Sequence, residues 1–238
     1  VPLALPHFAI DWQRLGEALS PRTRLIILNS PHNPSGALIT RAELDQLAAL
    51  IRERDIYLIS DEVYEHLVFD GVQHASVLAH EELYARAFVV SSFGKTYHVT
   101  GWKTGYVVAP PALTAELRKV HQYVSFCCVT PLQWALADYM AAHPEHVNEL
   151  PAFYQAKRDL FCQQLAGSRL QFTPTAGTYF QLADYSAIRD DLDDVAMAEW
   201  LTREHGVAAI PVSVFYQQPP QDLRLVRFCF AKREETLR

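Results

Sequence analysis

The chain has 238 residues, of which 21 are Lys or Arg and 27 are Asp or Glu, so its formal net charge is −6. Half of the residues are hydrophobic and 20% are charged, a globular composition with enough apolar material for a large core. The acidic balance argues against nucleic acid or an anionic membrane surface as the main partner. No apolar stretch approaches the ~18 residues that a membrane-spanning helix needs.

The first half of the chain alternates short apolar runs with polar or helical segments. Residues 24–28 are predicted to form a buried strand that opens into the turn-rich loop 29–36. Thr40 is predicted to cap a helix, with Glu43 completing a capping box. Further strands are predicted over 56–60, 87–91 and 106–109. Apolar strands separated by long connections favour a mainly parallel sheet that is covered on both faces.

The second half of the chain is predicted to be helical first and mixed afterwards. Helix is expected from residue 112 to about 167, with breaks near Pro131 and Pro144. Strands are expected over 179–183 and 223–230, with a helix over 193–205 between them. We therefore expect a large α/β domain over 1–140 and a smaller α+β domain over 141–238.

Polar clusters follow the ends of several predicted strands, where open α/β sheets bind ligands. They supply an amine, a carboxylate, a phenol, an amide and several groups that can bind an anion. Pyridoxal phosphate would use all of them, because it has a basic ring nitrogen, a phenolic oxygen, an aldehyde and a phosphate. The residues are Asn33, Asp61, Tyr64, Ser92, Lys95, Lys103 and Arg227.

The same clusters carry a family resemblance. The segment from Ser92 to Tyr106 resembles the Schiff-base segment of class I/II aminotransferases of fold type I. Residues 29–36 resemble their Asn-Pro-His-Asn-Pro-Ser/Thr-Gly loop, and residues 60–64 resemble their Asp-Glu-x-Tyr motif. Residues 226–232 resemble their carboxylate-binding strand, and the similarity runs almost end to end. Within the family, the chain is most similar to the methionine/kynurenine branch.

The resemblance implies a large domain built on a three-layer, mainly parallel sheet, and it implies a role for each candidate residue. Lys95 would hold pyridoxal phosphate as a Schiff base and then shuttle a proton. Asp61 would pair with the pyridine nitrogen, while Tyr64 and Asn33 would hydrogen-bond the phenolic oxygen of the ring. Arg227, together with Asn33, would bind the α-carboxylate of the substrate.

Ser92 and Lys103 are the implied phosphate-binding residues. Each of the seven candidate residues also has an ordinary structural interpretation. Lys95 and Lys103 could be solvated charges, Asp61 a helix cap and Asn33 a turn former. Tyr64 could be a half-buried aromatic, Ser92 a structural hydrogen-bonding group and Arg227 a surface ion-pair partner. The His143 and His146 pair has no third ligand in view, so no metal site is expected.

The implied activity is transfer of an amino group from an amino acid to a 2-oxo acid by a ping-pong, Schiff-base mechanism. Methionine, aromatic amino acids and kynurenine are the candidate donors. One alternative is a pyridoxal-phosphate-dependent β-lyase acting on cysteine conjugates, and another is a non-catalytic sensor domain with the same fold. The expected partners are small-molecule substrates and a second copy of the chain, with no nucleic acid and no membrane.

Family members are considerably longer at the N-terminus, and this chain begins at Val1 without an initiator Met. We therefore expect a longer parent protein, and weak or absent cofactor binding by these 238 residues alone. The four cysteines contain no CxxC motif and are expected to be reduced and mostly buried. These observations, with the absence of a basic signal-peptide segment, predict a cytoplasmic protein.

Overall fold

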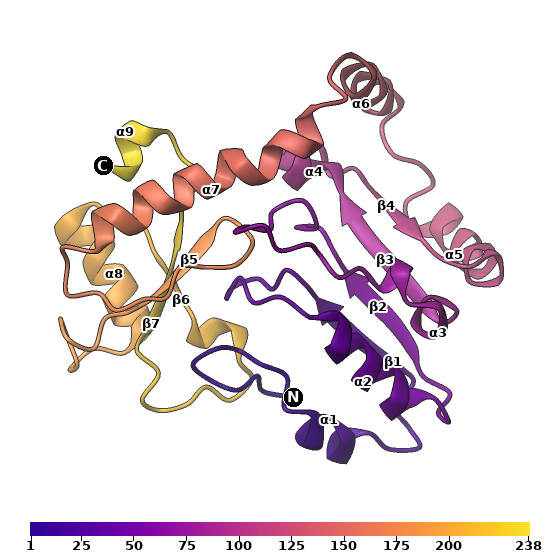
Figure 1. Ribbon diagram of the computed structural model, residues 1–238, viewed down its shortest axis with the longest axis horizontal. Helices are drawn as coiled ribbons and strands as arrows, with labels where there is room; N and C mark the ends of the chain where they lie inside the picture. The colour runs from indigo at the N-terminus through magenta and orange to yellow at the C-terminus, as the bar shows by residue number, and fades with distance from the viewer.

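The computed structural model describes residues 1–238 and contains two β-sheets with helices packed against them (Figure 1). The strands are β1 Leu25–Asn29, β2 Tyr57–Asp61, β3 Ala87–Ser92, β4 Gly105–Val108, β5 Phe180–Asp184, β6 Ile210–Pro211 and β7 Leu225–Cys229. The helices are α1 Trp12–Ala18, α2 Arg41–Ile51, α3 Glu81–Tyr84, α4 Phe93–Thr96, α5 Pro111–Val124, α6 Thr130–Ala142, α7 His146–Leu165, α8 Asp194–His205 and α9 Glu234–Leu237. Short 3-10 helices are η1 Val77–Ala79, η2 Thr100–Trp102 and η3 Ser213–Phe215.

The larger sheet has the order β1-β2-β3-β4. Strands β1, β2 and β3 are parallel, whereas β4 pairs antiparallel with β3. The connection between β3 and β4 carries only α4 and η2, and no crossover helix returns the chain to the other end of the sheet. The predicted α/β fold with a mainly parallel sheet is therefore confirmed, with an antiparallel strand at one edge.

Helix α2 covers one face of this sheet because its apolar residues recur at helical spacing. Its capping box forms as predicted: the backbone N–H of Glu43 donates to Thr40 Oγ1, and Glu43 accepts from the N–H of Thr40. The buried cluster between helix and sheet includes Leu44, Leu47, Ile51, Ile26, Leu28, Leu58 and Val89.

The opposite face of the sheet differs from the expectation. Leu25, Ile27 and Tyr57 are 43, 68 and 40% exposed, because strand residues alternate between the two faces and no helix lies over these three. The expected cover on both faces is therefore absent at these positions.

The smaller sheet has the order β5-β7-β6 and is antiparallel throughout. Helix α8 packs on it through Met197, which is buried with Tyr185, Val226 and Phe228. Helix α7 begins near α4, at one end of the larger sheet, and extends across the smaller sheet (Figure 1), and it stays continuous through Pro151.

The second core connects the two halves of the chain. It joins Tyr64, Leu67 and Phe69, which follow β2, to side chains from α7, β5 and the C-terminal segment. Those partners are Leu150, Tyr154, Phe180, Phe230 and Leu237. The two sheets lie on either side of residue 140 along the chain, and a domain boundary there remains a prediction.

The remaining elements include some that the sequence pattern did not predict. The helices over 111–165 and 194–205 and the strands at 180–184 and 225–229 lie where they were expected. Helix α1 and the two-residue strand β6 were not predicted. The four cysteines are free, as expected, but none is buried and Cys127 is exposed.

Candidate active site

The carboxyl ends of β1 and β2 bring three polar side chains together. Asn29 and Asp61 are partners in the strand register. The side-chain amide of Asn29 donates to the backbone carbonyl of Asp61 over 3.0 Å. Its side-chain oxygen accepts from the backbone N–H of Asn33 over 2.8 Å. Asn29 thereby fixes the start of the loop that carries Asn33 against the end of β2.

The Asp61 carboxylate is half-buried and has few partners. Its hydrogen bond from the backbone N–H of Val63 is long, at 3.3 Å. Burial raises the pKa of Asp61, and the positive charge of Lys95 partly opposes that rise. A half-buried carboxylate of this kind is suited to a cationic or N–H partner supplied by a ligand.

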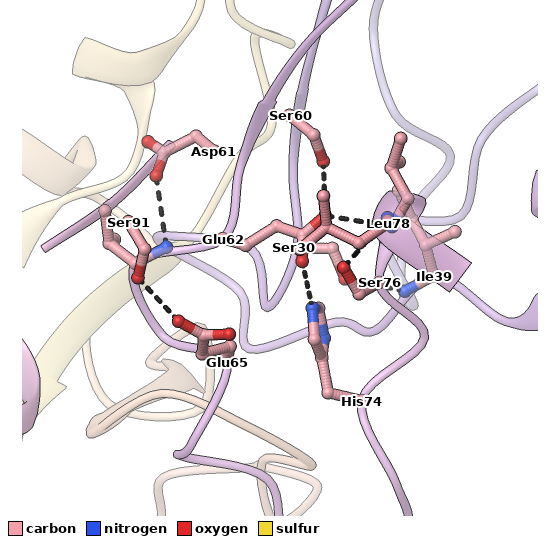
Figure 2. A network of polar contacts seen from close by, with 12 residues as sticks. Ser30, Ile39, Ser60, Asp61, Glu62, Glu65, His74, Ser76, Leu78 and Ser91 are labelled. Atoms are coloured by element: carbon pink, nitrogen blue, oxygen red, sulfur yellow. Dashed lines mark hydrogen bonds and ion pairs between the residues drawn. The ribbon is translucent and has the colours of Figure 1, made fainter. Parts of the chain in front are cut away.

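Glu62 points away from Asp61 and is buried in a polar network (Figure 2). It accepts from Ser60 Oγ at 2.9 Å and from the backbone N–H of Val77 at 3.0 Å. The Nε2 atom of His74 lies 2.7 Å from its other oxygen. Burial opposes ionisation, but hydrogen bonds from His74, Ser76 and the backbone of Val77 lower the pKa of Glu62 overall. The network fixes the turn that follows Asp61.

Lys95 lies on α4, directly after β3. Its Nζ atom is 5.7 Å from the ring centroid of Tyr64 and 5.9 Å from that of Tyr179. The two tyrosine rings meet edge to face at 5.4 Å. Burial, followed by the neighbouring Tyr179, raises the pKa of Tyr64, so its phenol is protonated and able to donate. The amine of Lys95 makes no hydrogen bond or ion pair within the chain.

A polar cavity of about 220 Å³ lies beside Lys95. None of its lining residues is hydrophobic. Ser92 caps α4, because its Oγ accepts from the backbone N–H of Gly94 at 3.0 Å. Lys103 is exposed and adopts a left-handed conformation with φ 55°. The lining residues are Ser92, Gly94, Lys95, Thr100, Lys103, Thr104 and Gly105. Hydroxyl groups, backbone N–H groups and two ammonium groups suit an anion.

Arg227 reaches the same region from β7. Its Nη1 donates to Asn33 Oδ1 over 2.6 Å. The guanidinium carbon lies 3.9 Å from the ring centroid of Phe180 and 5.5 Å from that of Phe215. The Nε atom is buried and has no partner, and burial lowers the pKa of Arg227. The other terminal nitrogen, Nη2, makes no hydrogen bond within the chain and suits a carboxylate.

The structure brings the predicted residues together in two linked groups. Asn33 contacts Arg227, and the cavity is shared by Ser92, Lys95 and Lys103. Tyr64 lies near Lys95, and Asp61 ends the strand beside β3. The chemical roles assigned to these residues remain predictions.

Sequence reasoning missed several groups at this site. It did not single out Asn29, although a polar residue at a strand end was a usable signal. It also did not single out Phe215, which flanks Arg227. Phe180 flanks Arg227 and Tyr179 flanks Lys95; for these two residues the sequence favoured a place in the core and left contact with a substrate as the alternative.

Comparisons with known proteins agree with this arrangement. The family model for aminotransferase class I and II matches residues 2–238. The methionine aminotransferase of Escherichia coli is 56% identical over 232 residues, which are 98% of this chain and 60% of that protein. Kynurenine–oxoglutarate transaminase 3 of Rattus norvegicus is 40% identical over 248 residues, covering 95% of this chain and 55% of that protein.

Solved structures give the same result. The structure of YbdL from Escherichia coli, described as having a methionine aminotransferase function, matches with a TM-score of 0.95 at 56% identity. It covers 99% of this chain and 62% of that one. N-succinyldiaminopimelate aminotransferase from Mycobacterium tuberculosis matches with a TM-score of 0.92 at 37% identity, covering 100% of this chain and 62% of that one. The chain thus spans about 60% of the length of these relatives.

Proposed function

The chain belongs to the class I and II aminotransferases, and on that premise we propose that its protein is a pyridoxal-phosphate-dependent aminotransferase. The observation that carries the proposal is the position of two groups at the ends of neighbouring strands, a lysine amine and a half-buried carboxylate. Asp61 ends β2 and Lys95 follows the neighbouring strand β3, and neither makes a hydrogen bond or ion pair to another side chain of the chain. Family members depend on pyridoxal phosphate, and that cofactor would engage both groups.

The residues present fit the cofactor. Asp61 would accept from the protonated pyridine nitrogen, which provides the cationic partner that this carboxylate lacks. The cavity beside Lys95 is lined by Ser92 and Lys103, which would supply the donors and positive charge that a phosphate needs. When bound, pyridoxal phosphate supplies an electron sink that stabilises negative charge at the substrate Cα.

Lys95 would hold the cofactor and later move a proton. Its amine lies near two aromatic rings and makes no hydrogen bond or ion pair within the chain, so it would be available to accept a proton from the substrate Cα. Tyr64 would donate a hydrogen bond from its neutral phenol, because burial keeps that group protonated. Together these two residues would control where the proton sits during amino transfer.

Arg227 and Asn33 would bind the substrate carboxylate. Asn33 holds the Nη1 arm of the guanidinium at 2.6 Å, which leaves Nη2 without a hydrogen-bond partner in the chain. A carboxylate would satisfy that donor, and the flat ring of Phe180 would fix the guanidinium plane. The substrate Cα would thereby be oriented toward Lys95.

We propose methionine, aromatic amino acids or kynurenine as the amino donor. The names of the relatives support this choice. So do the aromatic rings around Arg227, which suit a large apolar side chain. The relatives are named as aminotransferases, and their names give no support to a β-lyase or a sensor domain.

We also propose a homodimer in the cytoplasm. Aromatic side chains on and between α5 and α6 support an association surface, because Tyr123, Phe126 and Trp134 are 86, 79 and 67% exposed. Four free cysteines support a reducing compartment. No helix has both the length and the apolar character needed to cross a bilayer.

An amino-transfer assay tests the proposed activity. The protein, loaded with pyridoxal phosphate, is given methionine, kynurenine or aspartate together with a 2-oxo acid, and both products are quantified. We expect methionine or kynurenine to react faster than aspartate, because the aromatic rings of Phe180 and Phe215 beside Arg227 suit an apolar side chain better than an acidic one. Absence of amino transfer from every donor would contradict the proposal, and release of pyruvate and ammonia from a cysteine conjugate without oxo acid would favour a β-lyase.

A further inference from the structure

Glu65 ties the turn after β2 to two other strands. Its Oε1 atom accepts from Ser91 Oγ over 2.6 Å, a contact shown in Figure 2. The same oxygen accepts from the hydroxyl of Tyr106 over 2.9 Å. The Nε2 atom of His66 lies 3.7 Å away. One carboxylate oxygen therefore connects the turn to both β3 and β4.

The two hydroxyl donors belong to one rung of the sheet. Ser91 and Tyr106 are partners in the antiparallel register of β3 and β4, and the next pair is Ser92 with Gly105. Both residues of that next pair line the polar cavity beside Lys95. The rung that Glu65 holds is thus directly adjacent to the proposed cofactor phosphate site.

Glu65 itself lies in the turn after β2, which also carries Tyr64. Glu65 follows Tyr64 in the chain, and its backbone N–H donates to the carbonyl of Glu62 over 2.8 Å. Successive strand residues point to opposite faces, so Ser91 lies on the face opposite to Ser92. Glu65 therefore holds the turn and the cavity wall together from behind the site.

We propose that Glu65 is a positioning residue that sets Tyr64 and the adjacent cavity wall in the geometry that pyridoxal phosphate requires. The inference rests on the proposed function. Removing the carboxylate would leave the hydroxyl of Ser91, which is 4% exposed, without its acceptor. The turn and the β3–β4 rung could then shift independently, which would weaken cofactor binding without touching any cofactor-binding residue.

The test measures the dissociation constant for pyridoxal phosphate in the protein produced from its complete gene. Glu65→Ala is compared with Glu65→Gln, Ser91→Ala and Tyr106→Phe, and thermal unfolding is recorded for each variant. The control is Glu116→Ala, which removes an exposed carboxylate paired only with Lys119. We expect Glu65→Ala to raise the dissociation constant about tenfold, and the two hydroxyl deletions about threefold each.

Glu65→Gln should bind within about twofold of the unmodified protein, because its amide oxygen can still accept both hydroxyl groups. Variants that unfold earlier yet bind the cofactor normally below their transition would assign Glu65 a purely structural role and overturn the inference. If Glu65→Ala does not fold, the Ser91→Ala and Tyr106→Phe variants test the inference instead. Normal binding of pyridoxal phosphate by both would overturn the inference. Failure of the unmodified protein to bind pyridoxal phosphate would instead overturn the proposed function.

Discussion

At the scale of single residues, the site is built from polar side chains at strand ends. The sequence predicted Asn33, Asp61 and Lys95 because each ends or follows an apolar strand, and Arg227 because a charged residue inside an apolar strand needs a partner. The proximity of the first three could be expected from a parallel sheet, but the direct contact of Asn33 with Arg227, which lies on the second sheet, could not. The contact between Arg227 and Asn33 crosses 194 positions of the chain and follows no local pattern.

Arg227→Lys tests the proposed carboxylate contact. A lysine keeps the charge but loses both the Nη1 contact to Asn33 and the Nη2 donor. We expect kcat/KM for every amino donor to fall about 30-fold or more, because the α-carboxylate loses two-point binding. The measurement is steady-state kinetics with methionine. Arg203→Lys, an exposed change on α8, is the control, and equal kcat/KM values for both variants would contradict the assignment.

At the scale of elements, the strength of the local signal decided what could be predicted. Helix α2 was predicted to begin after Thr40, because both its cap and its apolar face are local. Helix α1 buries none of its residues, and β6 is only two residues long, so neither element shows a clear hydrophobic period in the sequence. These short elements depend on tertiary contacts that no local pattern reports.

Thr40→Ala tests the capping box. The change removes the hydroxyl that accepts from the N–H of Glu43, leaving an unsatisfied donor at the first turn of α2. We expect the free energy of unfolding to fall by about 1 kcal/mol in chemical denaturation. Thr40→Ser keeps the acceptor and should stay close to the unmodified protein. An equal loss in both variants would show that packing of the threonine methyl group, rather than the cap, stabilises the helix.

At the scale of the whole molecule, segments from different halves of the chain hold the two sheets together. Gly36, with φ 72°, lies against this joint, because an added Cβ atom would meet the side chain of Thr175 and the carbonyl of Gly177. Arg158 on α7 is buried; its Nη1 and Nη2 atoms donate to the Asp70 carboxylate, and Nη1 also donates to the carbonyl of Thr175. The sequence predicted two domains but not this joint, because its residues resemble ordinary turn and core residues.

The Arg158–Asp70 pair should make stability depend on pH. Hydrogen bonding to Arg158 lowers the pKa of Asp70 below its ordinary value of 3.8. The contribution of the pair is therefore complete above that ordinary value and is lost as the pH falls through the lower, folded-state pKa. Asp70→Asn should cost about 1 kcal/mol at neutral pH, a small effect because the carboxylate is exposed, and the acid-induced loss should become shallower.

Unfolding by urea between pH 2 and pH 7 checks this prediction. Asp222→Asn is the control, because Asp222 is exposed and forms no ion pair. The same acid-induced loss of stability in Asp70→Asn and in the unmodified protein would show that other groups cause it.

The central claim is that Lys95 holds pyridoxal phosphate, and covalent trapping tests it most directly. The protein produced from its complete gene, its Lys95→Ala variant and a Lys119→Ala control are mixed with the cofactor. Absorbance and intact mass are recorded before and after borohydride reduction, and the adduct is mapped. We predict a visible band and a reduced adduct on Lys95, both absent from Lys95→Ala and unchanged in Lys119→Ala. A folded, unmodified protein that yields no adduct, or an adduct on another lysine, would contradict the account.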